Sequence, residues 1–405
     1  TAHQELIQHM SSHNNNIMVM QSGGCTAVIN RSLAGIIRAA GRVLPESRVY
    51  GAAHGMEGLI SGKIPDLTEI STSKLSSLDT APGAALGSTR RKLRDEDVAP
   101  ILATLDQHGI HILHIIGGND SAETGMSISN EARIMGYDLK VVNVPKTIDN
   151  DLTETDHCPG YGSAARFIAQ ATLGAGRDAA AMGISSPITI IEIMGRDAGW
   201  LSAAGSMYKR DRYDPPHYIG VPEITFYEDV FLLRMEEAYR ENGYAIAVVA
   251  ENIKGPDGAI GGQTKPWFVD DFGHPYYDGP ARYLAEKVSR RLGVRCRHEK
   301  PGTIQRSFMD SVSKTDAMEA RMVGEAAIKA AAAGETDVIV SLVRGSNSPY
   351  KCDVNLVPLG KVAGNTRTLP EKYLPDESGN TSGEFKEYLE PLIGEPLQIP
   401  EHLLR

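Results

Sequence analysis

The residues best suited to chemistry lie together in one short segment, Pro145-Lys146-Thr147-Ile148-Asp149-Asn150-Asp151. Proline ends the apolar strand expected at 140–144, so the polar residues that follow should form a loop at its carboxyl end. A carboxylate there can accept the proton of an attacking hydroxyl, and a lysine can neutralise a phosphoryl group in transfer. The segment therefore suggests phosphoryl transfer, with an Asx-rich surface turn as the alternative.

Two further groups of small and polar residues stand where an expected strand meets a helix. In Gly117-Gly118-Asn119-Asp120-Ser121, Asp120 could ligate Mg²⁺, which prefers oxygen, although these residue types are equally favoured as helix N-caps. The Gly23-Gly24 pair would let the backbone approach a phosphate, but two such glycines are more often a tight turn. For each group, the sequence alone leaves both interpretations open.

Basic residues near other strand ends are candidate anion ligands. Met194-Gly195-Arg196-Asp197 follows the strand expected at 188–193, and Arg196 could grip a phosphate or pair with Asp197. Arg295, Arg297 and Arg306 flank Pro301-Gly302, which suggests an anion site or, in part, a solvated charged face.

Glu251 directly follows another expected strand, at 245–250, and could accept hydrogen bonds from sugar hydroxyls or cap a helix. His108, His111 and His114 do not share one face of an extended chain, and we interpret them as structural.

The elements that position these groups alternate between strand and helix. Apolar runs at 17–20, 110–116, 140–144, 188–193, 245–250 and 338–342 predict strands, and helical patterns such as 29–40 and 319–333 lie between them. This alternation predicts an α/β fold of parallel sheets with helices on both faces, in which ligands bind beyond the carboxyl ends of the strands. Two regions break the rhythm: 253–279, interpreted as an insertion or lid, and 345–405, interpreted as a C-terminal extension.

Composition narrows the function classes. A net charge of −10 argues against nucleic-acid binding, and no apolar run approaches the roughly 20 residues of a membrane span. The four scattered cysteines, Cys25, Cys158, Cys296 and Cys352, form no CxxC pair, which argues against a disulfide framework or zinc site and favours a cytoplasmic location. The first residues carry no secretory signal pattern.

Taken in order, GG, GGND, PKTIDNDL, MGRDAGW, AVVAE and GTIQR resemble the motifs of the 6-phosphofructokinase family from residue 23 to about 306. TIDND and MGR are highly specific to that family. The resemblance implies two Rossmann-like three-layer αβα domains with mostly parallel sheets and an active site in the cleft between them. We expect a larger phosphate-donor domain from 1–160 plus about 305–355, and a smaller sugar-phosphate domain from 161–304 plus about 356–405.

The resemblance also assigns roles. Asp149 is the expected base for the sugar's 1-hydroxyl, with Lys146 and Asp120 as the other catalytic residues. The expected sugar-phosphate ligands are Thr147, Asp151, Met194, Gly195, Arg196, Glu251, Arg297 and Arg306. Gly23, Gly24 and Ser121 are expected to bind the donor phosphates, and Asn119 and Asp120 to hold Mg²⁺. Arg297 would reach the site of a neighbouring subunit, which implies a homo-oligomer, either dimer or tetramer.

The choice of donor depends on Asp120 and Lys146. ATP-using members of the family have glycine at both positions, which leaves room for the α-phosphate and ribose. A carboxylate at 120 would repel the α-phosphate, and Lys146 would bind a short diphosphate instead. We therefore expect pyrophosphate and fructose 6-phosphate as substrates.

The chain departs from the family pattern at Asn119, where aspartate is usual, and at Thr303 and Pro187 near the sugar phosphate. The alternatives are an ATP-dependent phosphofructokinase, an NAD-binding dehydrogenase-like protein lacking the GxGxxG fingerprint, and a catalytically silent regulatory subunit.

Overall fold

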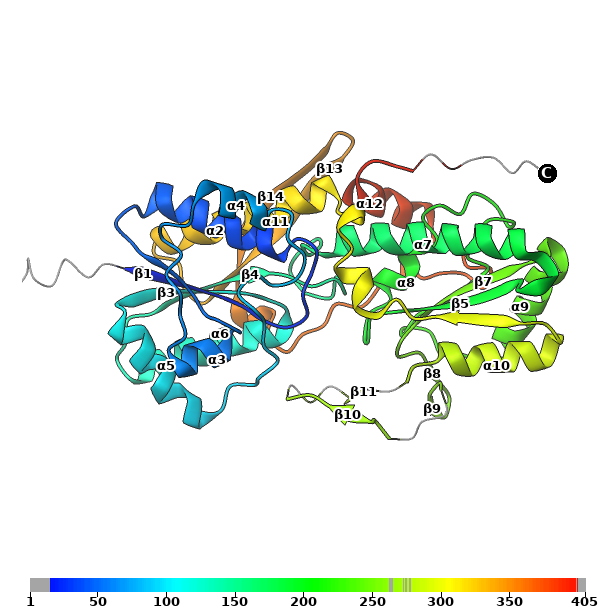
Figure 1. Ribbon diagram of the computed structural model, residues 1–405, viewed down its shortest axis with the longest axis horizontal. Helices are drawn as coiled ribbons and strands as arrows, with labels where there is room; N and C mark the ends of the chain where they lie inside the picture. Colours follow the sequence, from blue (N-terminus) through cyan, green and yellow to red (C-terminus); the bar gives the residue numbers. More distant parts are fainter. Residues whose placement is uncertain are drawn as a thin grey trace, which may run out of the picture.

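The computed structural model describes residues 15–261, 265–271, 273, 275–276, 278–397 and 399. They form two main sheets with helices on both faces (Figure 1), besides two small hairpins, which confirms the predicted α/β class. None of the helices in this part of the chain combines the length and apolarity that a membrane crossing requires.

The first sheet has six strands in the order β14-β13-β4-β3-β1-β2. Its strands are β1 (Asn16–Gln21), β2 (Val49–Gly51), β3 (Ile110–Gly117), β4 (Lys140–Pro145), β13 (Val338–Asn347) and β14 (Tyr350–Pro358). All neighbours are parallel except β13 and β14, which form an antiparallel hairpin.

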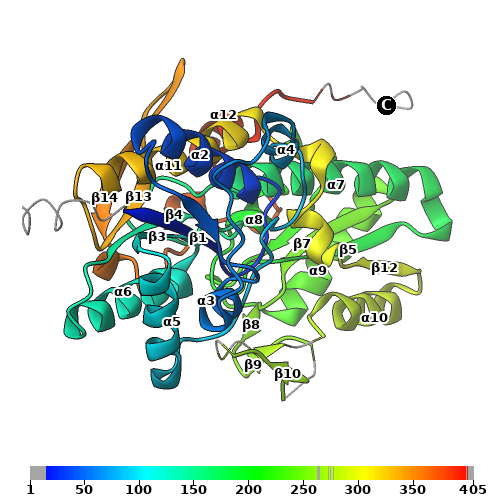
Figure 2. The ribbon, with the colours of Figure 1, turned by 60° about the vertical axis from the view of Figure 1, so that its left-hand side comes forward.

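Alternate side chains of the first sheet fill two cores, because successive residues of a strand point to opposite faces. Ile17 and Val19 pack under α2 (Ile29–Val43) and α11 (Lys314–Ala332). Met18 and Met20 pack under α3 (Met56–Ser61), α5 (Asp95–Gln107) and α6 (Asn119–Ile134). The short α4 (Thr72–Leu78) lies beside α2 (Figure 2).

The second sheet has four parallel strands in the order β12-β5-β7-β6. Its strands are β5 (Ile188–Ile193), β6 (Tyr218–Gly220), β7 (Ala245–Ala250) and β12 (Cys296–Glu299). One face packs against α7 (Tyr161–Met182), α8 (Trp200–Ala204) and α12 (Gly383–Ile393), and the other against α9 (Glu228–Asn242) and α10 (Ala281–Leu292). The predicted domain limits stay a prediction.

The two regions that break the βα rhythm contain more structure than the sequence suggested. Within 253–279 lie two small hairpins, β8 (Lys254–Gly255) with β9 (Gly258–Ala259) and β10 (Phe268–Val269) with β11 (Pro275–Tyr276).

The strand predicted at 338–342 continues to Asn347 and returns as β14, so part of the expected C-terminal extension belongs to the first sheet. This hairpin projects past the α2 and α11 layer (Figures 1 and 2). Residues 343–347 and most of β14 are exposed or half-buried, and they lack the continuous apolar run that marks the buried strands.

Candidate active site

A cavity of about 380 Å³ opens where the two sheets meet. Its wall is built from loops at the carboxyl ends of β1, β3 and β4 of the first sheet and of β5 and β7 of the second. Parallel α/β sheets bind ligands at this end of their strands. The cavity therefore lies where the sequence pattern placed the ligand site.

The cavity brings together most of the predicted site residues. Those that line it are Gly23, Gly24, Asn119, Asp120, Ser121, Lys146, Thr147, Asp149, Asp151, Met194, Arg196, Glu251 and Arg306. Gly195 and Arg297 do not line it. Gly195 forms the turn of its loop at φ +126°, and Arg297 on β12 forms an ion pair with Asp178 at 2.6 Å. The roles assigned to all these residues remain predictions.

The glycine pair after β1 faces two cations. Lys146 is buried, and its Nζ donates a hydrogen bond to the carbonyl of Gly24 at 2.6 Å. A Cβ on Gly23 would lie 3.3 Å from that Nζ, and a Cβ on Gly24 would lie 2.4 Å from Arg306 Nη1. Burial, with the nearby charge of Arg306, lowers the pKa of Lys146 to about 8. This arrangement can therefore accept an anion beside a lysine ammonium, and the donor-phosphate role of the turn stays a prediction.

Carboxylates also line the cavity. Burial, and then the negative charge of Glu251, raise the pKa of Asp149 to about 6. Burial, and then the charge of Asp149, raise the pKa of Asp151 to about 7. Arg196 lies 3.9 Å from Glu251 and lowers the pKa of Asp149. Asp149 is thus held near the range in which a carboxylate can exchange protons at neutral pH.

A buried amide oxygen beside these carboxylates indicates a site that could hold a cation. Asn119 Nδ2 donates to Asp151 Oδ2 at 3.3 Å, while Asn119 Oδ1 is buried with no hydrogen-bond partner among the described residues. Asp120 follows in the first turn of α6. Buried oxygens normally have a partner, and an oxygen-rich donor set suits Mg²⁺. The residues present therefore fit this ion.

Four lining residues escaped the sequence reasoning: Cys25, Arg90, Gly364 and Thr366. Arg90 forms an ion pair with Asp270 at 2.8 Å and so joins the 253–279 region to the cavity wall. Its only sequence signal is an adjacent pair of arginines in a stretch without periodicity. Gly364 and Thr366 belong to the C-terminal region and carried no signal.

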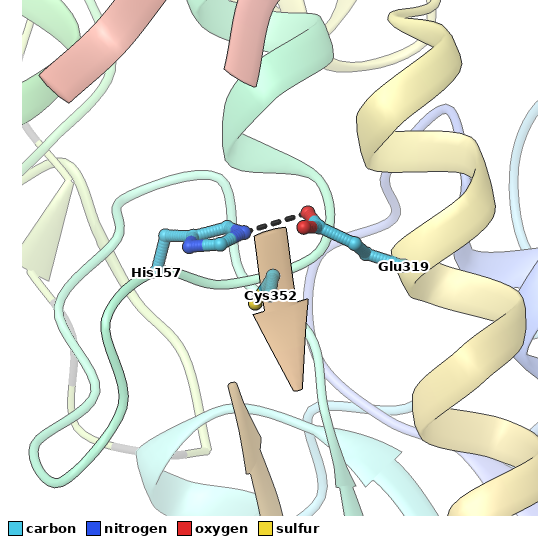
Figure 3. Close-up of side chains that lie close together, drawn as sticks. All are labelled: His157, Glu319 and Cys352. Carbon is cyan, nitrogen blue, oxygen red and sulfur yellow. Dashed lines mark hydrogen bonds and ion pairs between the residues drawn. The ribbon is translucent and has the colours of Figure 1, made fainter. Parts of the chain in front are cut away.

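Outside the cavity, buried His157 and Glu319 lie close to the half-buried Cys352 (Figure 3). His157 Nε2 lies 2.6 Å from Glu319 Oε2, and its Nδ1 lies 2.7 Å from Asp156 Oδ1. Burial lowers the pKa of His157, but the charges of Glu319 and Asp156 outweigh it and raise that pKa to about 9. Both ring nitrogens of His157 thus bond to carboxylates, and these residues form an internal ion-pair network.

Comparison with known proteins identifies the class. The family model described as Phosphofructokinase matches residues 16–331. The chain therefore belongs to the phosphofructokinase family.

Individual relatives cover nearly the whole chain. The pyrophosphate–fructose 6-phosphate 1-phosphotransferase of Rhodospirillum rubrum is 38% identical, over 93% of this chain and 94% of the relative. The sulfofructose kinase of Alkalicoccus urumqiensis is 32% identical, over 94% and 96%. The crystal structure of a pyrophosphate-dependent phosphofructokinase from Nitrosospira multiformis superposes with a TM-score of 0.86 at 32% identity, covering 96% of this chain and 94% of that one.

Proposed function

We propose that this protein transfers a phosphoryl group from pyrophosphate to the 1-hydroxyl of fructose 6-phosphate, giving fructose 1,6-bisphosphate and orthophosphate. The observation that carries the proposal is the Lys146 ammonium lying against the Gly23-Gly24 turn, with Asp120 lining the same cavity. Pyrophosphate is little more energetic than the product ester, so the reaction should run in both directions.

In the proposed mechanism the 1-hydroxyl oxygen attacks one phosphorus of pyrophosphate and the bond to the bridging oxygen breaks. Asp149 accepts the hydroxyl proton, and its raised pKa matches that task. Lys146 and Arg306 offset the charge on the donor, and orthophosphate leaves. Arg196 and Glu251, which line the same cavity as an ion pair, orient the sugar phosphate.

We assign a Mg²⁺ ion to Asn119 and Asp120. Support comes from the buried Asn119 Oδ1, which has no protein partner in the described part of the chain. When bound, Mg²⁺ would screen the negative charge of the diphosphate. Asp151, which accepts a hydrogen bond from Asn119, would help to orient this pair.

We also propose a cytoplasmic homo-oligomer, dimer or tetramer, with a donor domain built on the first sheet and a sugar-phosphate domain on the second. The position of Arg297, outside its own chain's cavity, supports a role in a neighbouring subunit's site.

The test measures fructose 1,6-bisphosphate and orthophosphate formed from fructose 6-phosphate, pyrophosphate and Mg²⁺. We expect turnover that Asp149→Asn reduces by roughly 10²–10⁴-fold, because only the base is lost. Sulfofructose, assayed in parallel, tests the acceptor. If the parent protein forms no bisphosphate, the proposed reaction is wrong.

A further inference from the structure

The C-terminal region reaches the cavity although it lies outside the matched family region, which ends at residue 331. After β14 the chain runs past the cavity, where Gly364 and Thr366 line the wall. It then continues to α12, which packs with α7 on the second sheet (Figure 1). One side chain in this stretch, Arg367, donates several hydrogen bonds to the loop that follows β4.

The Arg367 guanidinium donates to three backbone carbonyls of that loop. Nη2 lies 2.7 Å from Asn150 O, and Nη1 lies 2.5 Å from Thr155 O and 2.7 Å from Asp156 O. The backbone N–H of Arg367 donates to Asp151 O at 2.7 Å. The guanidinium also lies 4.7 Å from the ring centroid of buried Trp200.

The carbonyls that Arg367 binds belong to a strained loop. Asn150 and Glu154 have φ of +57° and +61°, the left-handed region that non-glycine residues rarely adopt. Such a conformation persists only where the surroundings impose it. Asn150 separates the two carboxylates of the cavity, Asp149 and Asp151, so the orientation of its peptide governs where both point.

The Asn150 side chain is held as firmly as its carbonyl. Its Nδ2 donates to the Tyr388 hydroxyl on α12 at 3.0 Å, and its Oδ1 accepts from Cys158 N at 3.0 Å. Asn150 is fully buried. Two residues of the C-terminal region, Arg367 and Tyr388, therefore hold the loop that follows β4.

We infer that Arg367 is a positioning residue for phosphoryl transfer, fixing the loop that carries Asp149 and Asp151. The catalytic part of this inference rests on the proposed function. Arginine suits the task because its planar fork offers five donors in fixed directions and stacks on an aromatic ring. A lysine would keep the charge but could not serve three carbonyls and the ring together.

The experiment compares Arg367→Gln and Arg367→Lys with the full-length parent protein. We expect kcat per folded chain to fall about tenfold or more in Arg367→Gln and by less in Arg367→Lys, because misplacing a catalytic group by 1 Å can cost 10²-fold in rate. The KM values for pyrophosphate and for fructose 6-phosphate should stay within about threefold of those of the parent protein. Hydrogen exchange should also speed up at the amides of residues 151–156. If Arg367→Gln does not accumulate as folded protein, the kcat and the hydrogen exchange of Arg367→Lys test the inference.

Arg38→Lys is the matched control. Arg38 also donates to a backbone carbonyl, that of Leu75 at 3.4 Å, and forms an ion pair with Asp79 at 2.8 Å, but it does not line the cavity and makes no hydrogen bond to the loop that Arg367 holds. Its kcat should stay within about twofold of the parent.

Unchanged kcat and unchanged exchange in both Arg367 variants would overturn the inference, as would an equal loss in Arg38→Lys. A parent protein without pyrophosphate turnover would instead refute the proposed function, while the exchange result still tests whether Arg367 holds the loop.

Discussion

Replacing Lys146 with methionine tests the donor site most simply. A Cβ on Gly23 would lie 3.3 Å from Lys146 Nζ. A phosphate bound to this turn would therefore lie within about 4 Å of the ammonium. Two unit charges at that distance, with an effective dielectric constant of about 20, interact by about 4 kcal/mol. At 1.36 kcal/mol per factor of ten, Lys146→Met should lower kcat/KM for pyrophosphate by ~10²–10³-fold.

The assay couples fructose 1,6-bisphosphate formation to NADH oxidation: aldolase releases dihydroxyacetone phosphate, which glycerol-3-phosphate dehydrogenase reduces with NADH. Lys209→Met is the matched control because Lys209 is also buried, with its pKa lowered to about 8 by burial, but it bonds carbonyls of Asp214 and Pro216 outside the cavity. Lys209→Met should lose stability and keep its kcat/KM per folded chain. A loss below about tenfold in Lys146→Met would refute the electrostatic reasoning.

Three further predictions follow from the same geometry. The pH profile of kcat/KM should rise through about 6 as Asp149 loses its proton and fall above about 8 as Lys146 loses its charge; a flat profile from pH 5 to 9 would contradict these assignments. Combining Asp120→Gly with Lys146→Gly should lower pyrophosphate use and admit ATP, and full retention of pyrophosphate activity would count against the donor argument. The pKa of His157 in the folded protein is raised to about 9 from an ordinary value of about 6.5. The free energy of unfolding that protonated His157 contributes should therefore be fully present below about pH 6.5 and should disappear as the pH rises through 9. Thermal melts should therefore show Tm falling between pH 7 and 9.5, and an equal fall in His157→Gln would show that another group is responsible.

Much of the cavity could be predicted from local sequence. The strands β1, β3, β4, β5 and β7 are short apolar runs, and glycine, proline or a polar cluster marks the carboxyl end of each. Since parallel α/β sheets place their ligands at that end, the sequence predicts that Lys146, Asp149 and Arg196 lie near one another.

The rest depends on contacts between distant segments, which no local pattern encodes. Arg367 acts on a loop more than 200 residues earlier, and its own surroundings in sequence are irregular. The strand β14 was missed because an exposed strand with polar residues lacks the apolar run of a buried one. The ion pair of His157 with Glu319 likewise joins the loop after β4 to α11.

The most direct test of the central claim is the ratio of kcat/KM for pyrophosphate to that for ATP, measured on the parent protein with fructose 6-phosphate and Mg²⁺. Lys146 and Asp120 together should make this ratio at least ~10², since each favours a bare diphosphate over a nucleotide. A ratio near or below one, with ATP accepted as readily as pyrophosphate, would contradict the account.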